Sequence, residues 1–160
     1  MELTKHFTLE EFTKSDKAIE LGINNTPNDE EMENIKFVAE QLELIRNTYK
    51  QPINITSGYR CEELNNAVGG VPNSYHRKGL AVDIKAESSN TFKGTKENKW
   101  LIENAYKYGF ILRYTDDTED ITGVKYESWH YRYVGTQIAS YLNEHDMTYD
   151  EYYIRFLDRR

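Results

Sequence analysis

The sequence predicts one α+β domain over residues 1–160, with a small, mostly antiparallel sheet and flanking helices. A chain of 160 residues is long enough for one hydrophobic core and short for two. Helical patterns fill the first third of the chain, and short strand patterns then alternate with helical ones. No internal repeat, low-complexity segment or linker composition divides the chain, so we expect a single unit.

Two helices are predicted before residue 51. In "HFTLEEFTKSD", Thr8 and Glu11 have the spacing of a capping box that opens a short helix. The stretch "TPNDEEMENIKFVAEQLELIRNTYK" predicts a long helix with Thr26 as its cap. Apolar residues recur in it at helical spacing and are expected to face the core: Met32, Ile35, Ala39, Leu42, Ile45 and Tyr49.

The middle of the chain predicts strands separated by short helices and turns. "INITSGYR" alternates and then turns, so we expect a strand that ends near Ser57, and "CEELNNAVGG" predicts a short helix closed by its two glycines. "GLAVDIKA" is almost continuously apolar, which is typical of a central strand. "SSNTFKGT" predicts a loop, and "KENKWLIENAYKYG" predicts a helix that ends at Gly109.

The last third predicts two more strands and a helical tail. "FILRYT" and "YESWHYRYVG" are the predicted strands, and "DDTEDITG" between them predicts a polar turn. "TQIASYLNEH" and "TYDEYYIRFLD" predict helices, the second with a capping box formed by Thr148 and Glu151.

Composition excludes several classes of protein. The formal net charge of −7 argues against a nucleic-acid binder, which usually carries a basic patch. No segment approaches the roughly 20 apolar residues of a membrane span. The start, "MELTKHFTLEEF", lacks an apolar run of signal-peptide length, so we expect synthesis in the cytoplasm. With Cys61 as its one cysteine, the chain has no internal disulfide.

Two residues in "SYHRKGLAVDI" suggest a metal site. His76 and Asp83 offer an imidazole nitrogen and a carboxylate oxygen, which suit zinc, and a catalytic zinc needs a third protein ligand. Of the four histidines, His130 is the best third candidate, because its predicted strand can pair beside "GLAVDI"; His6 and His145 are expected to face solvent. From the spacing alone, a turn that leads into a buried strand remains an equal alternative.

Glu127 and Arg60 add chemistry to this site. Glu127 precedes His130 by three residues and could act as the general base that a hydrolytic zinc site needs. In a regular strand the two side chains would point to opposite faces, so we predict a turn or bulge near Ser128. The guanidinium of Arg60 could stabilise an oxyanion, although a surface ion pair is the alternative interpretation.

Four segments together resemble the zinc D-alanyl-D-alanine peptidases of the LAS group, which share a fold with the hedgehog signalling domain. They are "SGYR", "LNNAVGG", "SYHRKGLAVDI" and "YESWHYRYVG". The pattern SxHxxGxAxD of that family is matched in full by Ser74, His76, Gly79, Ala81 and Asp83, and its ExWH element by Glu127, Trp129 and His130. Two motifs in the right order make the resemblance specific.

The resemblance implies a role for each matched residue. His76, Asp83 and His130 would bind Zn²⁺, with Glu127 as general base and then general acid. Arg60 would stabilise the polarised carbonyl, and a further pair would shape the substrate cleft: Ser74 and Trp129. Peptidoglycan stem peptides would be the substrates of a protein expected to be a monomer.

The resemblance leaves three functions open. The second half of the chain is similar to D,D-carboxypeptidases of the vancomycin-resistance type, which implies removal of the terminal D-Ala. The first half is similar to short phage and bacterial peptidases, which implies as an alternative an L-Ala-D-Glu endopeptidase that acts on the cell wall as a phage endolysin, after release by lysis. A non-catalytic, zinc-stabilised binding module is the third, and Glu127 argues against it, since a binding module needs no base.

Overall fold

The computed structural model describes residues 1–85 and 91–160. In this part of the chain the strands form one antiparallel sheet in the order β1-β2-β4-β3. They are β1 (Asn54–Ser57), β2 (Ala81–Lys85), β3 (Phe110–Leu112) and β4 (His130–Tyr133). The predicted α+β class with a small antiparallel sheet is confirmed, and β2 is central, as its apolar run indicates.

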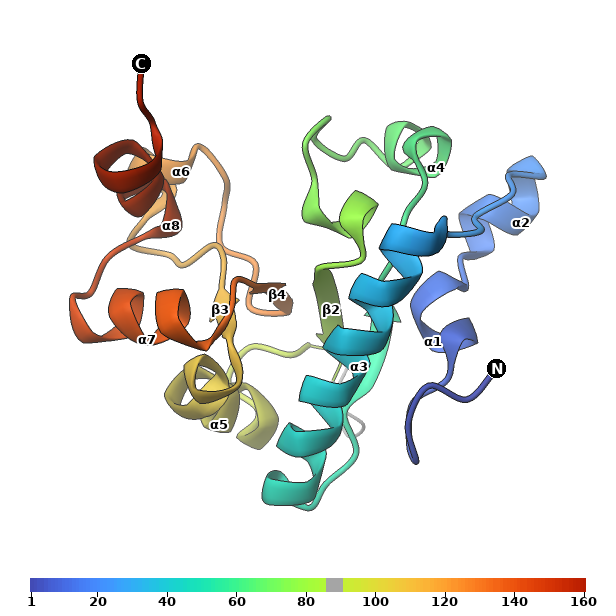
Figure 1. Cartoon of the computed structure of the whole chain (residues 1–160), viewed down its shortest axis with the longest axis horizontal. Coiled ribbons are helices and arrows are strands. Elements are labelled where there is room, and N and C mark those ends of the chain that lie inside the picture. Colours follow the sequence, from blue (N-terminus) through green and yellow to red (C-terminus); the bar gives the residue numbers. More distant parts are fainter. Residues whose placement is uncertain (86–90) are drawn as a thin grey trace.

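Helices flank the sheet on both sides, with α1 and α3 beside β1 and β2 and α5 and α7 beside β3, while α2 lies near α4 and α6 near α8 (Figure 1). Their bounds are α1 Leu9–Thr13, α2 Asp16–Leu21, α3 Asp29–Tyr49, α4 Glu62–Ala67, α5 Lys96–Asn104, α6 Glu119–Thr122, α7 Thr136–Glu144 and α8 Tyr149–Tyr152. Two 3₁₀ turns and a final π-helical turn complete the elements: η1 Tyr75–Lys78, η2 Ala105–Tyr108 and η3 Tyr153–Leu157. None of the helices in the described ranges is long and apolar enough to cross a membrane.

The long helix α3 begins two residues later than predicted. Its cap is Asn28, whose side chain accepts the backbone N–H of Glu31, while the Glu31 carboxylate accepts the N–H of Asn28. Thr26, the predicted cap, instead donates its hydroxyl to Asn24. The prediction was wrong because Asn28 and Glu31 form a reciprocal box that satisfies two free N–H groups, whereas the residue at that spacing from Thr26 is Asp29, whose side chain is one methylene shorter than the Glu or Gln of such a box.

One face of α3 and one face of the sheet form the core. The buried residues of α3 are Ile35, Val38, Ala39, Leu42 and Ile45, while Met32 and Tyr49, also predicted to be core residues, are only partly buried. Val82 and Ile84 of β2 and Tyr131 of β4 pack into the same cluster. Because side chains alternate along a strand, Asp83 and His130 point to the opposite face.

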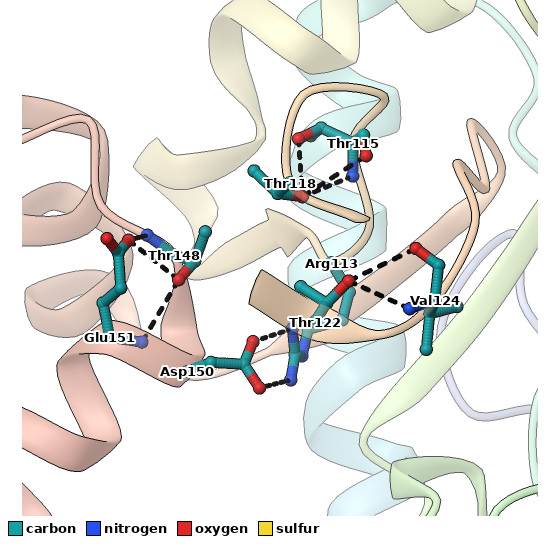
Figure 2. A network of polar contacts seen from close by, with 8 residues as sticks. All are labelled: Arg113, Thr115, Thr118, Thr122, Val124, Thr148, Asp150 and Glu151. Carbon is teal, nitrogen blue, oxygen red and sulfur yellow. Dashed lines mark hydrogen bonds and ion pairs between the residues drawn. The ribbon is translucent and has the colours of Figure 1, made fainter. Parts of the chain in front are cut away.

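The second half departs from the predicted elements at three places. The strand predicted over "FILRYT" ends at Leu112, and the polar turn "DDTEDITG" contains the single helical turn α6. The strand predicted over "YESWHYRYVG" begins only at His130. The capping box of Thr148 and Glu151 is confirmed at α8 (Figure 2). Part of the predicted loop "SSNTFKGT" and the last residue of "GLAVDIKA" lie outside the described residues.

Candidate metal centre and cleft

Three side chains that are distant in sequence converge on one point above the sheet. Asp83 of β2 and His130 of β4 are direct partners in the antiparallel register, and η1 supplies His76. Oδ1 of Asp83 lies 2.9 Å from Nδ1 of His130 and 3.3 Å from Nε2 of His76, and these two nitrogens are 3.2 Å apart. Ligands at about 2.0–2.1 Å from a tetrahedral zinc lie roughly 3.3 Å from one another, so the donor atoms fit such an ion.

The orientation of His76 is fixed from behind. Its ring is almost fully buried, and Nδ1 lies 2.5 Å from the carbonyl oxygen of Gly58. A carbonyl only accepts, so Nδ1 carries the proton and the Nε2 lone pair faces the other two ligands. The turn ends at Gly79 with φ +69°, where a Cβ would lie 2.7 Å from the Ile35 side chain. The close approach of η1 to α3 therefore depends on this glycine.

Asp83 is held as a carboxylate. Burial alone would raise its pKa, but the contacts with His130 and His76, chiefly hydrogen bonds, lower that pKa well below the usual range. Its second oxygen, Oδ2, lies 3.4 Å from a terminal nitrogen of Arg60. An anionic oxygen therefore faces both imidazoles, as a ligand for a divalent cation requires.

Glu127 lies just before β4, and a turn at Ser128 and Trp129 separates it from His130. The backbone N–H of His130 donates to the carbonyl of Glu127 at 3.3 Å, so the predicted irregularity near Ser128 is present. Both Glu127 and His130 consequently line the same cleft. Desolvation raises the pKa of Glu127 and Asp83 raises it further, while His130 and Arg60 oppose the shift. A raised pKa suits a group that takes up and returns a proton near neutral pH.

Arg60 follows β1 and is not a surface residue, because its side chain is only 18% exposed. Nε donates to the hydroxyl of Ser57 at 3.2 Å, and a terminal nitrogen reaches Asp83. Burial lowers the pKa of Arg60, and the charges of Asp83 and Glu127 counter that effect. The alternative of a surface ion pair is therefore wrong.

The centre lies in a cleft of 320 Å³. Two residues that the resemblance implies as cleft residues, Ser74 and Trp129, both line it. The other lining residues include the three candidate ligands, Glu127 and Arg60, and several that the sequence analysis did not select: Arg113, Tyr114, Val124 and Arg132. Tyr114 stacks on His130 at 5.4 Å between ring centroids. No motif marks Tyr114, but strand alternation from His130 could have found Arg132.

The other two histidines lie elsewhere. His145 is exposed and stacks on Tyr141, as expected of a solvent-facing residue. His6 was also expected to face solvent, but it is partly buried, with Nδ1 2.6 Å from the carboxylate of Glu43. That acid lies on α3, 37 residues away in the sequence, so no local pattern predicts its contact with His6.

Comparison with known proteins identifies relatives of the chain. The model of the VanY family, described as D-alanyl-D-alanine carboxypeptidase, matches residues 32–136. A D-alanyl-D-alanine carboxypeptidase of Enterococcus faecalis is 46% identical over 79 residues, which make up 49% of this chain and 29% of that protein. The chain thus matches less than half the length of the curated relatives.

Solved structures are similar over most of the chain. An LdcB LD-carboxypeptidase is 33% identical with a TM-score of 0.67, covering 77% of this chain and 69% of that one. VanYB in complex with D-alanine-D-alanine is 29% identical with a TM-score of 0.66, covering 78% and 82%. A VanY D,D-pentapeptidase variant in complex with Zn(II) is 31% identical with a TM-score of 0.60, covering 75% and 81%.

The family match spans well over half of the chain and contains the three converging side chains together with Glu127 and Arg60. The fold around them is that of the solved D,D-peptidases. This chain therefore belongs to the VanY family of D-alanyl-D-alanine carboxypeptidases.

Proposed function

We propose that the chain is a zinc-dependent carboxypeptidase that removes the terminal D-Ala of peptidoglycan stem peptides. The observation that carries the proposal is the convergence of His76, Asp83 and His130 in a cleft that also holds Glu127. VanY relatives with D-alanine-D-alanine or Zn(II) bound support the substrate and the metal.

His76, Asp83 and His130 would hold the zinc ion. Imidazole and carboxylate donors suit Zn²⁺, and three protein ligands leave the open position of a catalytic rather than a structural site. Held by these three residues, zinc would supply two things: a lowered pKa of a coordinated water, toward about 7, and polarisation of the substrate carbonyl. The Gly58 carbonyl behind His76 supplies the outer hydrogen bond that orients such a ligand.

Glu127 and Arg60 would carry out the remaining chemistry. Glu127 accepts a proton from the attacking water as the water oxygen bonds to the scissile carbonyl carbon. The guanidinium of Arg60 stabilises the negative charge that develops on the carbonyl oxygen. When the C–N bond breaks, Glu127 returns the proton to the leaving D-Ala nitrogen. One water is consumed, and a shortened peptide and free D-Ala are released.

The experiment is product analysis by mass spectrometry. Zinc-loaded protein is incubated with a muropeptide pentapeptide and, separately, with the tetrapeptide, with Glu127→Ala as the control. Loss of one alanine from the pentapeptide, absent with the variant, is the expected result. Alanine loss from the tetrapeptide alone would replace the proposal with an L,D-carboxypeptidase like the LdcB relative. A fragment that begins at D-Glu would establish an L-Ala-D-Glu endopeptidase. Zinc binding without any cleavage would establish a non-catalytic binding module.

We also propose that the protein acts as a monomer, because residues of a single chain complete the cleft. Light scattering of the zinc-loaded protein at assay concentration tests this: a dimer mass would contradict it.

A further inference from the structure

Three arginines line the cleft within the described residues, and they differ in their partners. Arg60 forms an ion pair with Asp83. Arg113 forms a bidentate ion pair with Asp150, in which its two terminal nitrogens lie 2.7 and 3.1 Å from the carboxylate oxygens (Figure 2). Arg132 is only 6% exposed, yet it forms no ion pair with any carboxylate in the part of the chain that the structure describes. A buried guanidinium without a counter-charge is unfavourable, so this position is suited to an anion from outside.

Arg132 lies on the same face of the sheet as the metal ligands. It follows His130 by two residues along β4. In the pairing of β4 with β2, Arg132 lies opposite Ala81 and His130 lies opposite Asp83. Residues two apart on a strand project to the same side, about 7 Å from one another. Arg132 lines the same cleft as these ligands.

Two tyrosine rings hold the guanidinium of Arg132 in place. Its central carbon lies 3.2 Å from the ring centroid of Tyr75 and 3.8 Å from that of Tyr149. The aromatic faces stabilise a cation but do not neutralise it. Nε of Arg132 is buried and has no hydrogen-bond partner among the described residues. The group is therefore rigid and desolvated, and no carboxylate among the described residues pairs with it.

We propose that Arg132 binds the C-terminal carboxylate of the stem peptide and so makes the enzyme an exopeptidase. The inference rests on the proposed function and names the group that selects its substrate. Guanidinium and carboxylate form two parallel hydrogen bonds of high directional specificity. In the substrate, about 4 Å separates the scissile carbonyl carbon from the carboxylate carbon, across the amide nitrogen and one Cα. A peptide whose scissile carbonyl lies at the metal centre thus places its carboxylate toward Arg132.

Helix α8 supports this end of the cleft. Tyr149 packs on Arg132, and the neighbouring Asp150 pairs with Arg113. Tyr149 and Asp150 both lie after residue 136, outside the residues that the family model matches.

The test compares diacetyl-L-Lys-D-Ala-D-Ala with its C-terminal amide, which differs only in the charge of the last group. For zinc-loaded wild type, we expect kcat/KM to be about 100-fold higher on the free acid. Arg132→Gln should lose about 100-fold on the free acid and almost nothing on the amide, with Arg132→Lys between the two. Arg77→Gln, which removes an arginine that pairs with exposed Glu62, is the matched control and should preserve the preference.

Equal losses on acid and amide would overturn the inference, because Arg132 would then only hold α8 and η1 together. Unchanged kinetics on the acid would overturn it as well. Thermal unfolding of each variant checks that the fold is retained, and Arg132→Lys remains informative if Arg132→Gln does not fold.

Calorimetric binding of the same two peptides to zinc-loaded Glu127→Ala, with and without Arg132→Gln, separates this inference from the proposed function. If wild type cleaves neither peptide but the acid binds more tightly than the amide only when Arg132 is present, the proposed function fails, and of the inference only the binding of the carboxylate by Arg132 stands. If neither peptide binds, both fail.

Discussion

At one end of the cleft, backbone structure holds the functional groups: the register of β2 and β4 aligns Asp83 with His130, and the Gly58 carbonyl orients His76. At the other end, side chains from a different segment hold the functional groups, since Tyr149 and Asp150 of α8 fix Arg132 and Arg113. The metal end therefore follows from the sheet itself. The far end depends on how the C-terminal segment packs, so chemistry and substrate selection are built by separate parts of the chain.

The largest effect is expected at the metal end, from Glu127→Gln. Removal of a general base typically costs about 10²–10⁴ in rate, and zinc content should not change because Glu127 is not one of the converging ligands. Steady-state kinetics with metal analysis of the same sample measures both. The matched control is Glu119→Gln, an exposed acid on α6. If Glu127→Gln retained activity within tenfold of wild type, Glu127 would not be the base.

Gly79→Ala tests whether the metal end depends on backbone packing. The new Cβ would meet Ile35 at 2.7 Å and the Glu31 carbonyl at 3.0 Å, at a φ of +69°. We expect a loss of about 2–4 kcal/mol in the free energy of unfolding and weaker zinc binding, because η1 carries His76. Urea unfolding and zinc titration measure these.

Gly22→Ala is the control for this substitution, because Gly22 has a similar φ of +66° but no atom within 4 Å of the new Cβ. It should lose only the cost of a left-handed backbone at a residue with a Cβ, about 1–2 kcal/mol in the free energy of unfolding, with zinc affinity unchanged. Equal destabilisation by the two variants would mean that the contact between η1 and α3 does not position His76.

Asp150→Asn tests the far end. It leaves the guanidinium of Arg113, whose side chain is 11% exposed, without its carboxylate. We expect a loss of about 1–3 kcal/mol in the free energy of unfolding and a raised KM, while zinc affinity stays at the wild-type value. A parallel fall in zinc affinity would show that the two ends of the cleft are coupled and are not built separately.

The two ends also differ in how far the sequence predicts them. His76, Asp83, Glu127 and His130 were predicted because each lies in a short motif, and strand pairing then brings the motifs together. The contacts of Arg132 were not predicted, because no local pattern states that Tyr149 packs on it.

The predictions that were wrong, for the cap of α3 and for the exposure of His6, have the same kind of cause. The cap of α3 was placed at Thr26 although a reciprocal box with Glu31 favours Asn28. His6 was expected to face solvent, but Glu43, distant in sequence, binds it. Local motifs predict elements and ligands, whereas contacts between distant side chains require the fold.

The smallest effect is expected from Glu43→Gln, away from both ends of the cleft. Burial would raise the pKa of Glu43, but hydrogen bonds from His6 and Thr4 outweigh it and lower that pKa below 4.5. A group with a lowered folded-state pKa stabilises the protein above its unfolded pKa, and this stabilisation is lost as the pH falls through the folded value. Wild type should therefore lose about 1 kcal/mol more than Glu43→Gln between about pH 5 and about pH 3. Urea unfolding across that range measures the difference, and identical pH profiles would contradict it. Activity at neutral pH should not change, because Glu43 does not line the cleft.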